Sequence, residues 1–452
     1  MNETGRTANG AVTNLSTLNS CLDLFAIIGA SRGKDIAATF HRAYSENPDV
    51  ALRVLLWARD CRGGSGERKT VHDLIAHLIG LDPVVASKVI AKMPEVGYWK
   101  EVVGYISNEN PIVAEAAMSL VIGGLASGDK LCAKWTPRKG PVANQIRKSL
   151  GLDPKGYRKL LVGLTTVVEQ DMSANQWTAI NYSHVPSVAS SNYSKAFAAH
   201  DPVRYGEFVQ KATTGEVKVN SAVLFPHTIV QQAVGGNVIS DAQWNQLPDY
   251  FEGNGESAIV VVDMSGSMGS GVTPSVRPID VATGLGIYCA QRMNGPFKNQ
   301  WITFSGTPTM ETLKGKTLKE IVRNMHTAHV GYNTNFVAVF ETILKQALKF
   351  SLPESAMPSK VLAISDMEFD QSGTETNFST VRKLYEKAGY KMPQLVFWNV
   401  NAREGNMPVT MHDSGTALVS GFSPSILTSV FGNISPVEVM MRAISNPRYD
   451  LP

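Results

Sequence analysis

The stretch that decides the fold reads Ala258-Ile259-Val260-Val261-Val262-Asp263-Met264-Ser265-Gly266-Ser267-Met268. Its first five residues are apolar and mostly β-branched, a pattern typical of a strand buried on both faces of a parallel sheet. Asp263 ends this run, and Ser265 and Ser267 follow at alternate positions. Open α/β sheets bind ligands at the carboxyl ends of their strands, and three oxygen side chains suit a hard cation such as Mg²⁺. The alternative is that these side chains only cap a helix.

Two later segments have the composition needed to complete such a site. Residues 331–336 (Gly-Tyr-Asn-Thr-Asn-Phe) form a polar loop before an apolar helical pattern at 336–350. Residues 360–366 (Lys-Val-Leu-Ala-Ile-Ser-Asp) give a second buried-strand pattern that ends in a carboxylate. Parallel strands place their carboxyl ends at one edge of the sheet, so we expect these loops to converge.

These three segments, in this order, resemble the von Willebrand factor type A domain and its metal-ion-dependent adhesion site. The resemblance implies a doubly wound (Rossmann-like) sheet. It also implies that Mg²⁺ is bound, directly or through water, by Asp263, Ser265, Ser267, Thr334 and Asp366.

Residues 251–434 show the alternation of strand and helix patterns that a parallel sheet with helices on both faces requires. The predicted strands are 258–263, 300–304, 360–365, 394–399 and 417–420. The predicted helices are 280–293, 318–325, 336–350, 377–387 and 424–431. Glu368 and Asp370 follow the second motif closely, and we interpret them as solvated loop acids. Residues 435–452 are expected to form a last helix and a tail that contacts the first domain.

The first half of the chain is predicted to be helical. Residues 1–14 are polar and are interpreted as a flexible tail. Residues 15–250 carry successive helical patterns separated by Gly, Pro and Asn turns, with few strand signals. This density of helices favours antiparallel pairs stacked as a HEAT-like repeat. The predicted helices include 37–44, 49–60, 70–79, 83–92, 98–106, 112–122, 144–150 and 157–170.

Positive charge is concentrated between residues 130 and 159, a segment that contains nine Lys and Arg residues and a single acid, Asp153. Trp135 and Tyr157 lie within this run. Basic side chains beside aromatic rings suit a nucleic-acid backbone with stacked bases. The alternative is a solvated basic face with Trp135 in the core. The predicted RNA-binding residues in this run are Lys130, Lys134, Trp135, Arg138, Lys139, Arg147, Lys148, Arg158 and Lys159.

The segment 59–70 (Arg-Asp-Cys-Arg-Gly-Gly-Ser-Gly-Glu-Arg-Lys-Thr) is a basic, glycine-rich turn. It does not match the nucleotide-binding P-loop, because Arg68 stands where glycine must precede the lysine and the segment follows a helix. A turn between two helices is the favoured interpretation. Its cations Arg62, Arg68 and Lys69 are retained as further RNA-binding candidates.

Length and composition are those of a globular protein of two or three domains, with 452 residues and 43% hydrophobic residues. No apolar span approaches the length of a membrane helix, so no membrane partner is expected. The N-terminus lacks the pattern of a signal peptide. The four cysteines lack metal-ligand spacing, which favours reduced thiols and a cytoplasmic location.

The combination of the two halves resembles the Ro autoantigen and its bacterial relatives, in which a TROVE-type helical repeat precedes a type A domain. A family related to Ro, found in phages, bacteria, fungi and plants, is closer still. The resembling segments are 59–68, 93–99, 134–138, 185–189, 225–227, 263–268 and 366–370. Ro proteins take single-stranded ends of misfolded RNA and small structured RNAs, and the resemblance implies a ribonucleoprotein.

Three functions remain open from the sequence. The first is a Ro-like RNA-binding scaffold, with a basic helical domain that binds the RNA backbone and a type A domain that binds a divalent cation. The second is a Mg²⁺-dependent adhesion or assembly module, phage- or virion-associated, that binds a protein partner through the metal. The third, a metal-dependent hydrolase, lacks a base and nucleophile by motif, so we expect no enzymatic activity.

Overall fold

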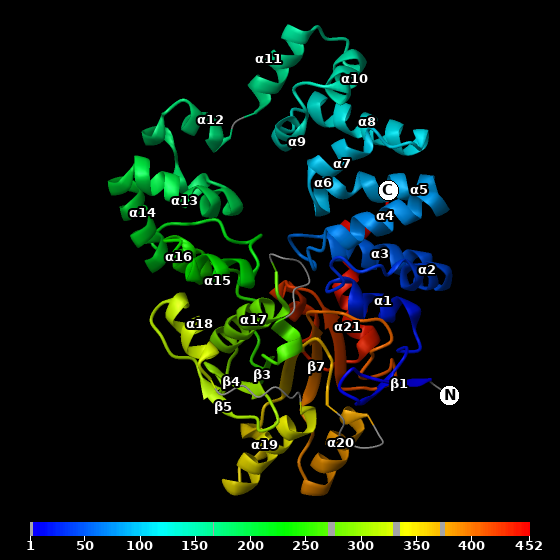
Figure 1. The fold of residues 1–452 in the computed structure, drawn as a ribbon, viewed down its shortest axis with the longest axis vertical. Coiled ribbons are helices and arrows are strands. Elements are labelled where there is room, and N and C mark those ends of the chain that lie inside the picture. The colour runs from blue at the N-terminus through cyan, green and yellow to red at the C-terminus, as the bar shows by residue number, and fades with distance from the viewer. Residues whose placement is uncertain (1–2, 166, 270–275, 329–334, 371–375) are drawn as a thin grey trace.

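The computed structural model describes residues 3–452 except 166, 270–275, 329–334 and 371–375. It confirms the predicted fold class, because a helical half leads into an α/β unit built on a mainly parallel sheet (Figure 1). No described helix has the length and apolar character that crossing a membrane would require.

The sheet follows the doubly wound order β5-β4-β3-β6-β7-β8. Its strands are β3 (Ala258–Asp263), β4 (Gln300–Phe304), β5 (Met310–Thr312), β6 (Lys360–Ser365), β7 (Gln394–Asn399) and β8 (Thr416–Ser420). All pairs are parallel except β4 with β5. Every residue of β3 and β6 is buried, as their continuous apolar runs require. The chain leaves these two neighbours in opposite directions, which makes their carboxyl ends the switch point of the sheet.

Helices cover the sheet and connect it to the helical half. They are α17 (Pro278–Arg292), α18 (Leu318–His326), α19 (Phe336–Lys349), α20 (Asn377–Ala388) and α21 (Pro436–Ile444), with a 3₁₀ turn at Pro424–Ser429. The helix α17 packs on β3, β4 and β6, while α19 contacts β4 and α20. The last helix, α21, contacts β8 and also reaches the helical half.

The helical half rises as one limb and returns as another, so that it traces an arch over the α/β unit (Figure 1). The first limb holds α1 (Ser20–Ile28), α2 (Ala37–Glu46), α3 (Pro48–Arg59), α4 (Lys69–Leu81), α5 (Pro83–Ala91), α6 (Met93–Val96), α7 (Trp99–Tyr105), α8 (Pro111–Ala126), α9 (Lys130–Trp135), α10 (Pro141–Ser149) and α11 (Pro154–Leu164). The second limb holds α12 (Val168–Ser173), α13 (Ser187–His200), α14 (Pro202–Thr214), α15 (Pro226–Val234) and α16 (Ser240–Asn245), with 3₁₀ turns at Trp177–Ala179 and Tyr182–His184.

The two limbs differ in how they are stabilised. The first limb shares one hydrophobic core with the α/β unit, and α15 of the second limb joins that core. The middle of the second limb instead rests on two smaller clusters, one around Phe197 and Tyr205 and one around Ala212 and Ile239. Because each small cluster buries little apolar surface, this part of the arch is held mainly by local contacts.

The limbs meet again at their base. Gly66, in the turn between α3 and α4, adopts a left-handed backbone (φ 71°), and a Cβ there would lie 2.4 Å from the ring of Phe225 at the start of α15. The Phe225 ring stacks on His227, and His227 meets Phe422 of the α/β unit edge to face. Ser425 also donates a hydrogen bond to the Gly64 carbonyl. The helical half therefore closes on itself and on the α/β unit through one shared joint.

The prediction of a flexible tail at residues 1–14 is wrong for residues 3–14. Strands β1 (Thr4–Arg6) and β2 (Val12–Asn14) form a hairpin. Its turn docks on the α/β unit, where the Thr7 hydroxyl donates to the Phe369 carbonyl and the Ala8 N–H donates to Glu368. Polar composition indicated disorder, but these polar groups are satisfied by partners more than 350 residues away along the chain.

Smaller differences have local causes. The predicted helix 157–170 is broken between α11 and α12, where the run Thr165-Thr166-Val167-Val168 places four β-branched residues together and disfavours a helix. The prediction that Glu368 is a solvated acid is also wrong, since its side chain is buried. Strand β5 was not predicted, because three residues carry little periodic signal.

Candidate metal centre and basic surface

The sheet brings two predicted metal ligands together at its switch point. Asp263 ends β3, and Asp366 directly follows β6, the strand hydrogen-bonded beside it. Both carboxylates are buried. Ser265 and Ser267 follow Asp263 in a tight loop, and their hydroxyl oxygens lie 3.1 Å apart. Four of the five predicted ligands thus share one sheet edge, and the fifth, Thr334, lies outside the described residues.

Neighbouring groups fix the orientation of Asp263. The Ser265 N–H donates to Oδ1 at 2.9 Å, and the Ser365 hydroxyl donates to Oδ2 at 2.6 Å. The Met367 N–H in turn donates to the Ser365 hydroxyl at 3.1 Å. Ser365 was not among the predicted site residues, although it is the last residue of the predicted strand and adjoins Asp366. Its role is to position the Asp263 carboxylate.

The electrostatics of the site are unfavourable for two bare carboxylates. Burial, followed by the nearby charge of Asp366, raises the pKa of Asp263 to about 6. Burial also raises the pKa of Asp366, and a hydrogen bond with Ser267 opposes that effect. Oxygen Oδ2 of Asp366 is buried and accepts no hydrogen bond from the described residues. A buried acceptor of this kind is costly unless another group satisfies it.

This donor set fits a hard divalent cation. Two carboxylates and two hydroxyls are oxygen ligands of the kind that Mg²⁺ prefers, and a dication would offset the repulsion between the carboxylates. Across the described residues there is no group of three or more His, Cys, Asp or Glu side chains arranged for a metal, so a site rich in nitrogen or sulfur ligands is absent from that part of the chain.

Arg403, Asn406 and the N-terminal hairpin lie beside this edge, where they contact Glu368. Glu368, two residues after Asp366, is engaged by Arg403 (Nε–Oε1 3.3 Å), by Asn406 Nδ2 and by the Ala8 N–H. Its carboxylate is therefore occupied by protein donors and is a poor candidate for a metal ligand. The hairpin could not be anticipated from the sequence, because nothing local to residues 3–14 indicates where they dock.

The predicted basic surface lies on α9, α10, α11 and their connections, at the top of the arch in Figure 1. Most of its cations are exposed and form no hydrogen bond or ion pair among the described residues. These residues are Lys130, Arg138, Lys139, Lys148, Lys155, Arg158 and Lys159. We refer to them, together with Trp135, as the apex surface.

Two cations of the run are partly engaged. Lys134 forms an ion pair with Glu169 (3.7 Å), which links the two limbs near their top. Arg147 donates to the Leu152 carbonyl at 2.8 Å and so braces the end of α10. Tyr157 is buried, and its hydroxyl donates to the Pro137 carbonyl. Tyr157 is therefore a structural residue of the apex.

Trp135 is 38% exposed, so the alternative that it is a core residue is wrong. The ammonium groups of Lys100 and Lys134 lie 5.5 and 5.8 Å from the centre of its ring. Lys100 was not predicted, because it lies 35 positions earlier in the sequence, on α7. An exposed indole between lysines is a surface on which a base can stack and a phosphate can be held.

Acidic residues in this region serve other purposes. Asp129 and Asp153 are the N-caps of α9 and α11, and each accepts backbone N–H groups there. Asp129 also accepts the indole N–H of Trp99 at 3.0 Å. Because these carboxylates are used as caps, they do not neutralise the exposed cations of the apex surface.

The three cations predicted from the glycine-rich turn are engaged elsewhere. Arg62 donates to the Glu95 carbonyl at 2.8 Å, Arg68 pairs with the buried Glu101 at 3.2 Å, and Lys69 pairs with Asp73 at 2.9 Å. These contacts lie around α4, α6 and α7 and are separate from the apex surface. The turn thus acts as a structural joint, in agreement with its favoured interpretation.

Comparison with known proteins matches both halves. A family model described as a domain of unknown function (DUF2828) matches residues 7–106 and 143–261. A second, also described as a domain of unknown function (DUF7788), matches residues 257–442. The change from one model to the other coincides with β3. Neither description states an activity.

Two individual proteins are similar over most of the chain. An uncharacterized protein, L728, of Acanthamoeba polyphaga mimivirus is 27% identical over 501 residues, covering 97% of this chain and 86% of the viral protein. The crystal structure of the Deinococcus radiodurans RO (RSR) protein matches 94% of this chain and 86% of its own with 12% identity and a TM-score of 0.37. At that score the likeness carries no functional argument.

Proposed function

We propose that this protein is an RNA-binding scaffold that holds single-stranded or locally unpaired RNA on the apex surface. The observation that carries the proposal is the apex surface itself. Its seven exposed cations form no hydrogen bond or ion pair among the described residues, and the exposed ring of Trp135 has two further lysines near it. The Ro resemblance of the sequence points to the same class of ligand.

The arrangement supports backbone binding with limited base readout. Lys and Arg side chains on three short helices can each neutralise a phosphate without regard to sequence. A base that stacks on Trp135 would replace one of the two ammonium groups near the ring. The displaced lysine would then be free to contact the adjacent phosphate. Stacking on an aromatic ring is tolerant of sequence, because every base presents such a face.

The second part of the proposal is a Mg²⁺ ion at the sheet edge. Asp263, Ser265, Ser267 and Asp366 would hold it, with Thr334 as the further ligand that the type A resemblance implies. Bound there, the ion would compensate the negative charges of the two buried carboxylates. Its first effect is on the stability of the two loops that meet at the switch point.

The test of RNA binding measures the fluorescence anisotropy of labelled single-stranded and duplex RNA. One variant combines Arg138→Glu, Lys139→Glu and Lys155→Glu. The control variant combines Lys298→Glu, Lys316→Glu and Lys387→Glu, three exposed lysines outside the apex with the same total change in charge. A further pair, Trp135→Ala and Trp135→Phe, separates stacking from charge.

We expect the apex variant to bind at least tenfold more weakly than the control variant. If about five phosphates are contacted, affinity of the wild-type protein for single strands falls about a hundredfold between 50 and 200 mM salt. Trp135→Ala should weaken binding by about five- to a hundredfold, and Trp135→Phe should restore most of it. Equal binding by the apex and control variants would refute the proposal.

The same proteins test the alternative function, a Mg²⁺-dependent assembly module. The observation in its favour is the buried Oδ2 of Asp366, which accepts no hydrogen bond from the described residues, because a metal there could take a partner's carboxylate. Self-association or partner capture that needs Mg²⁺ and is lost in Asp263→Ala, together with unaltered RNA binding in the apex variant, would replace the scaffold by this alternative.

A further inference from the structure

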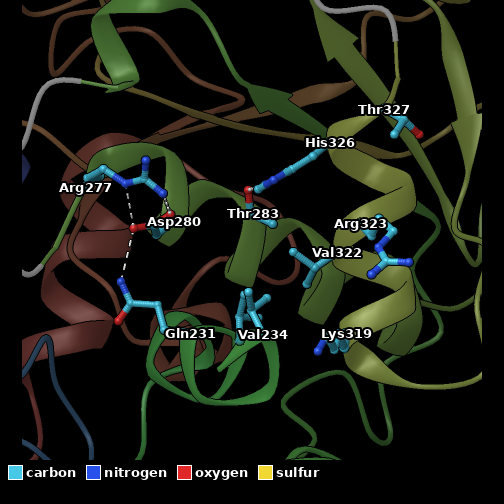
Figure 2. Close-up of a pocket in the computed structure, with 11 residues that line it drawn as sticks. Gln231, Val234, Arg277, Asp280, Thr283, Lys319, Val322, Arg323, His326 and Thr327 are labelled. Atoms are coloured by element: carbon cyan, nitrogen blue, oxygen red, sulfur yellow. Dashed lines mark hydrogen bonds and ion pairs between the residues drawn. The ribbon is translucent and has the colours of Figure 1, made fainter. Parts of the chain in front are cut away.

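A cavity of about 700 Å³ lies between α15 of the second limb and α17 and α18 of the α/β unit, apart from both the metal centre and the apex surface. Its size falls in the range of small-molecule sites. Figure 2 shows its lining, in which Val234 of α15 lies toward Lys319 and Val322 of α18, while Gln231 of α15 points to Asp280. No motif in the sequence indicated it, because its walls come from three separated segments.

The floor of the cavity is apolar. Val230, Val234 and Val322 contribute to it, and Val234, the last residue of α15, remains 49% exposed. An exposed aliphatic surface inside a concave site is stabilised when an apolar or flat group covers it. The site therefore suits a ligand that has an apolar body as well as a charged end.

The charged groups of the lining are arranged in two sets. In the first set, Asp280 is already satisfied, because Arg277 binds it through two hydrogen bonds (2.7 and 3.0 Å) and Gln231 donates to it at 3.1 Å. Figure 2 shows Asp280 held between these two residues. His326 reaches across the cavity to Thr283, with 3.2 Å between Nε2 and the hydroxyl oxygen.

The second set is unsatisfied. Lys319 and Arg323 stand one helical turn apart on α18 and line the same cavity. Neither forms a hydrogen bond or an ion pair within the described part of the chain. With Arg277 and Asp280 included, and His326 neutral, the titratable lining carries three positive charges and one negative charge, a net charge of +2.

We infer that this cavity binds a small phosphate monoester whose body is apolar or planar, with a nucleoside monophosphate as the simplest example. Arg323 offers a planar fork of donors to phosphate oxygens, and Lys319 offers a point charge beside it. A phosphate monoester carries close to two negative charges at neutral pH, which matches the surplus of the lining. The body of the ligand lies over Val230, Val234 and Val322.

The test is isothermal titration calorimetry with inorganic phosphate, adenosine 5′-monophosphate, glucose 6-phosphate and adenosine. The cavity variant combines Lys319→Ala and Arg323→Ala, and both side chains are exposed, so the fold is retained. The control variant combines Lys314→Ala and Lys316→Ala, which removes the same charge just before α18 without altering the lining. A short RNA is added with a 5′-phosphate and with a 5′-hydroxyl.

The expected result is that adenosine 5′-monophosphate binds the wild-type protein with a submillimolar Kd. It should bind the cavity variant at least tenfold more weakly and the control variant within twofold of wild type. Adenosine 5′-monophosphate should bind more tightly than inorganic phosphate or adenosine, since the site holds both ends of the ligand.

Three results would overturn the inference. The first is that no phosphate ester binds the wild-type protein at millimolar concentration. The second is that the cavity variant binds as well as the control variant. The third is that only the 5′-phosphorylated RNA binds, which would make the site an RNA-end site in place of a small-molecule site.

Discussion

The joint at the base of the arch predicts a large effect from one small substitution, Gly66→Ala. Gly66 has a left-handed backbone, and an added Cβ would lie 2.4 Å from the ring of Phe225. A non-glycine residue in that conformation costs about 1–2 kcal/mol. Displacing a packed ring costs about 1–3 kcal/mol more. The free energy of unfolding of the joint should therefore fall by roughly 2–5 kcal/mol.

The assay is hydrogen exchange read by mass spectrometry on peptides that contain the turn and α15. Local opening reports the stability of this joint, whereas global unfolding of a chain with several cores is not a two-state process. Since 1.4 kcal/mol corresponds to a factor of ten, amides of α15 should exchange about thirtyfold faster or more in the variant.

A double-mutant cycle with Phe225→Ala separates the two contributions. Once the ring is absent, Gly66→Ala should cost only the backbone contribution of about 1–2 kcal/mol. Gly215→Ala, which has a left-handed backbone and open space around it, should show that same cost. Gly123→Ala, on an exposed position of α8, should be neutral or gain up to about 1 kcal/mol. An equal cost of Gly66→Ala with and without Phe225 would refute the proposed contact.

The remaining predictions concern buried ionisable groups. Burial, followed by the positive charge of Arg32, lowers the pKa of His227 to about 3, so its proton is bound in the unfolded chain but not in the fold at pH 3–6.5. The free energy of unfolding should therefore fall as the pH drops below about 6.5, by about 2 kcal/mol at pH 5. In pH-dependent denaturation, the His227→Gln variant should lose that part of the slope. An unchanged slope in the variant would contradict this role of His227. Asp263→Asn should stabilise the metal-free protein by up to about 3 kcal/mol, from a pKa raised from 3.8 to about 6. It should also abolish any rise in Tm caused by Mg²⁺, and a Tm rise equal to that of the wild type would count against Asp263 as a ligand.

Local patterns predicted the strands that carry the candidate metal ligands. The apolar runs that end at Asp263 and Asp366 are long and continuous, which is the pattern of a strand buried on both faces of a parallel sheet. The two carboxylates lie near each other because β3 and β6 are parallel neighbours in the sheet. By contrast, the sequence did not predict that Ser365 orients Asp263 or that Glu368 is a buried acceptor. Both roles depend on side-chain directions, which the periodicity of a sequence does not reveal.

For the apex surface, the count of charged residues in the sequence predicted the segment but not which basic residues stay unpaired in the fold. An excess of cations over 130–159 identified the right segment, and the structure leaves most of those cations exposed. Counting could not distinguish them from Arg62, Arg68 and Lys69, which are equally basic in sequence. Those three are paired because Glu95, Gly97, Glu101 and Asp73 happen to face them in the fold.

The sequence by itself determined what neighbouring residues can decide: a helical first half, a parallel sheet after residue 257, and polar loops at the ends of two buried strands. These follow from periodicity, β-branching and turn residues, which act within a few positions along the chain. Only the tertiary structure decided the docking of the N-terminal hairpin, the closure of the arch at Gly66 and Phe225, and the cavity between α15, α17 and α18. Each of these depends on groups far apart in sequence, whose contact is set by how the elements pack and not by any one element's own pattern.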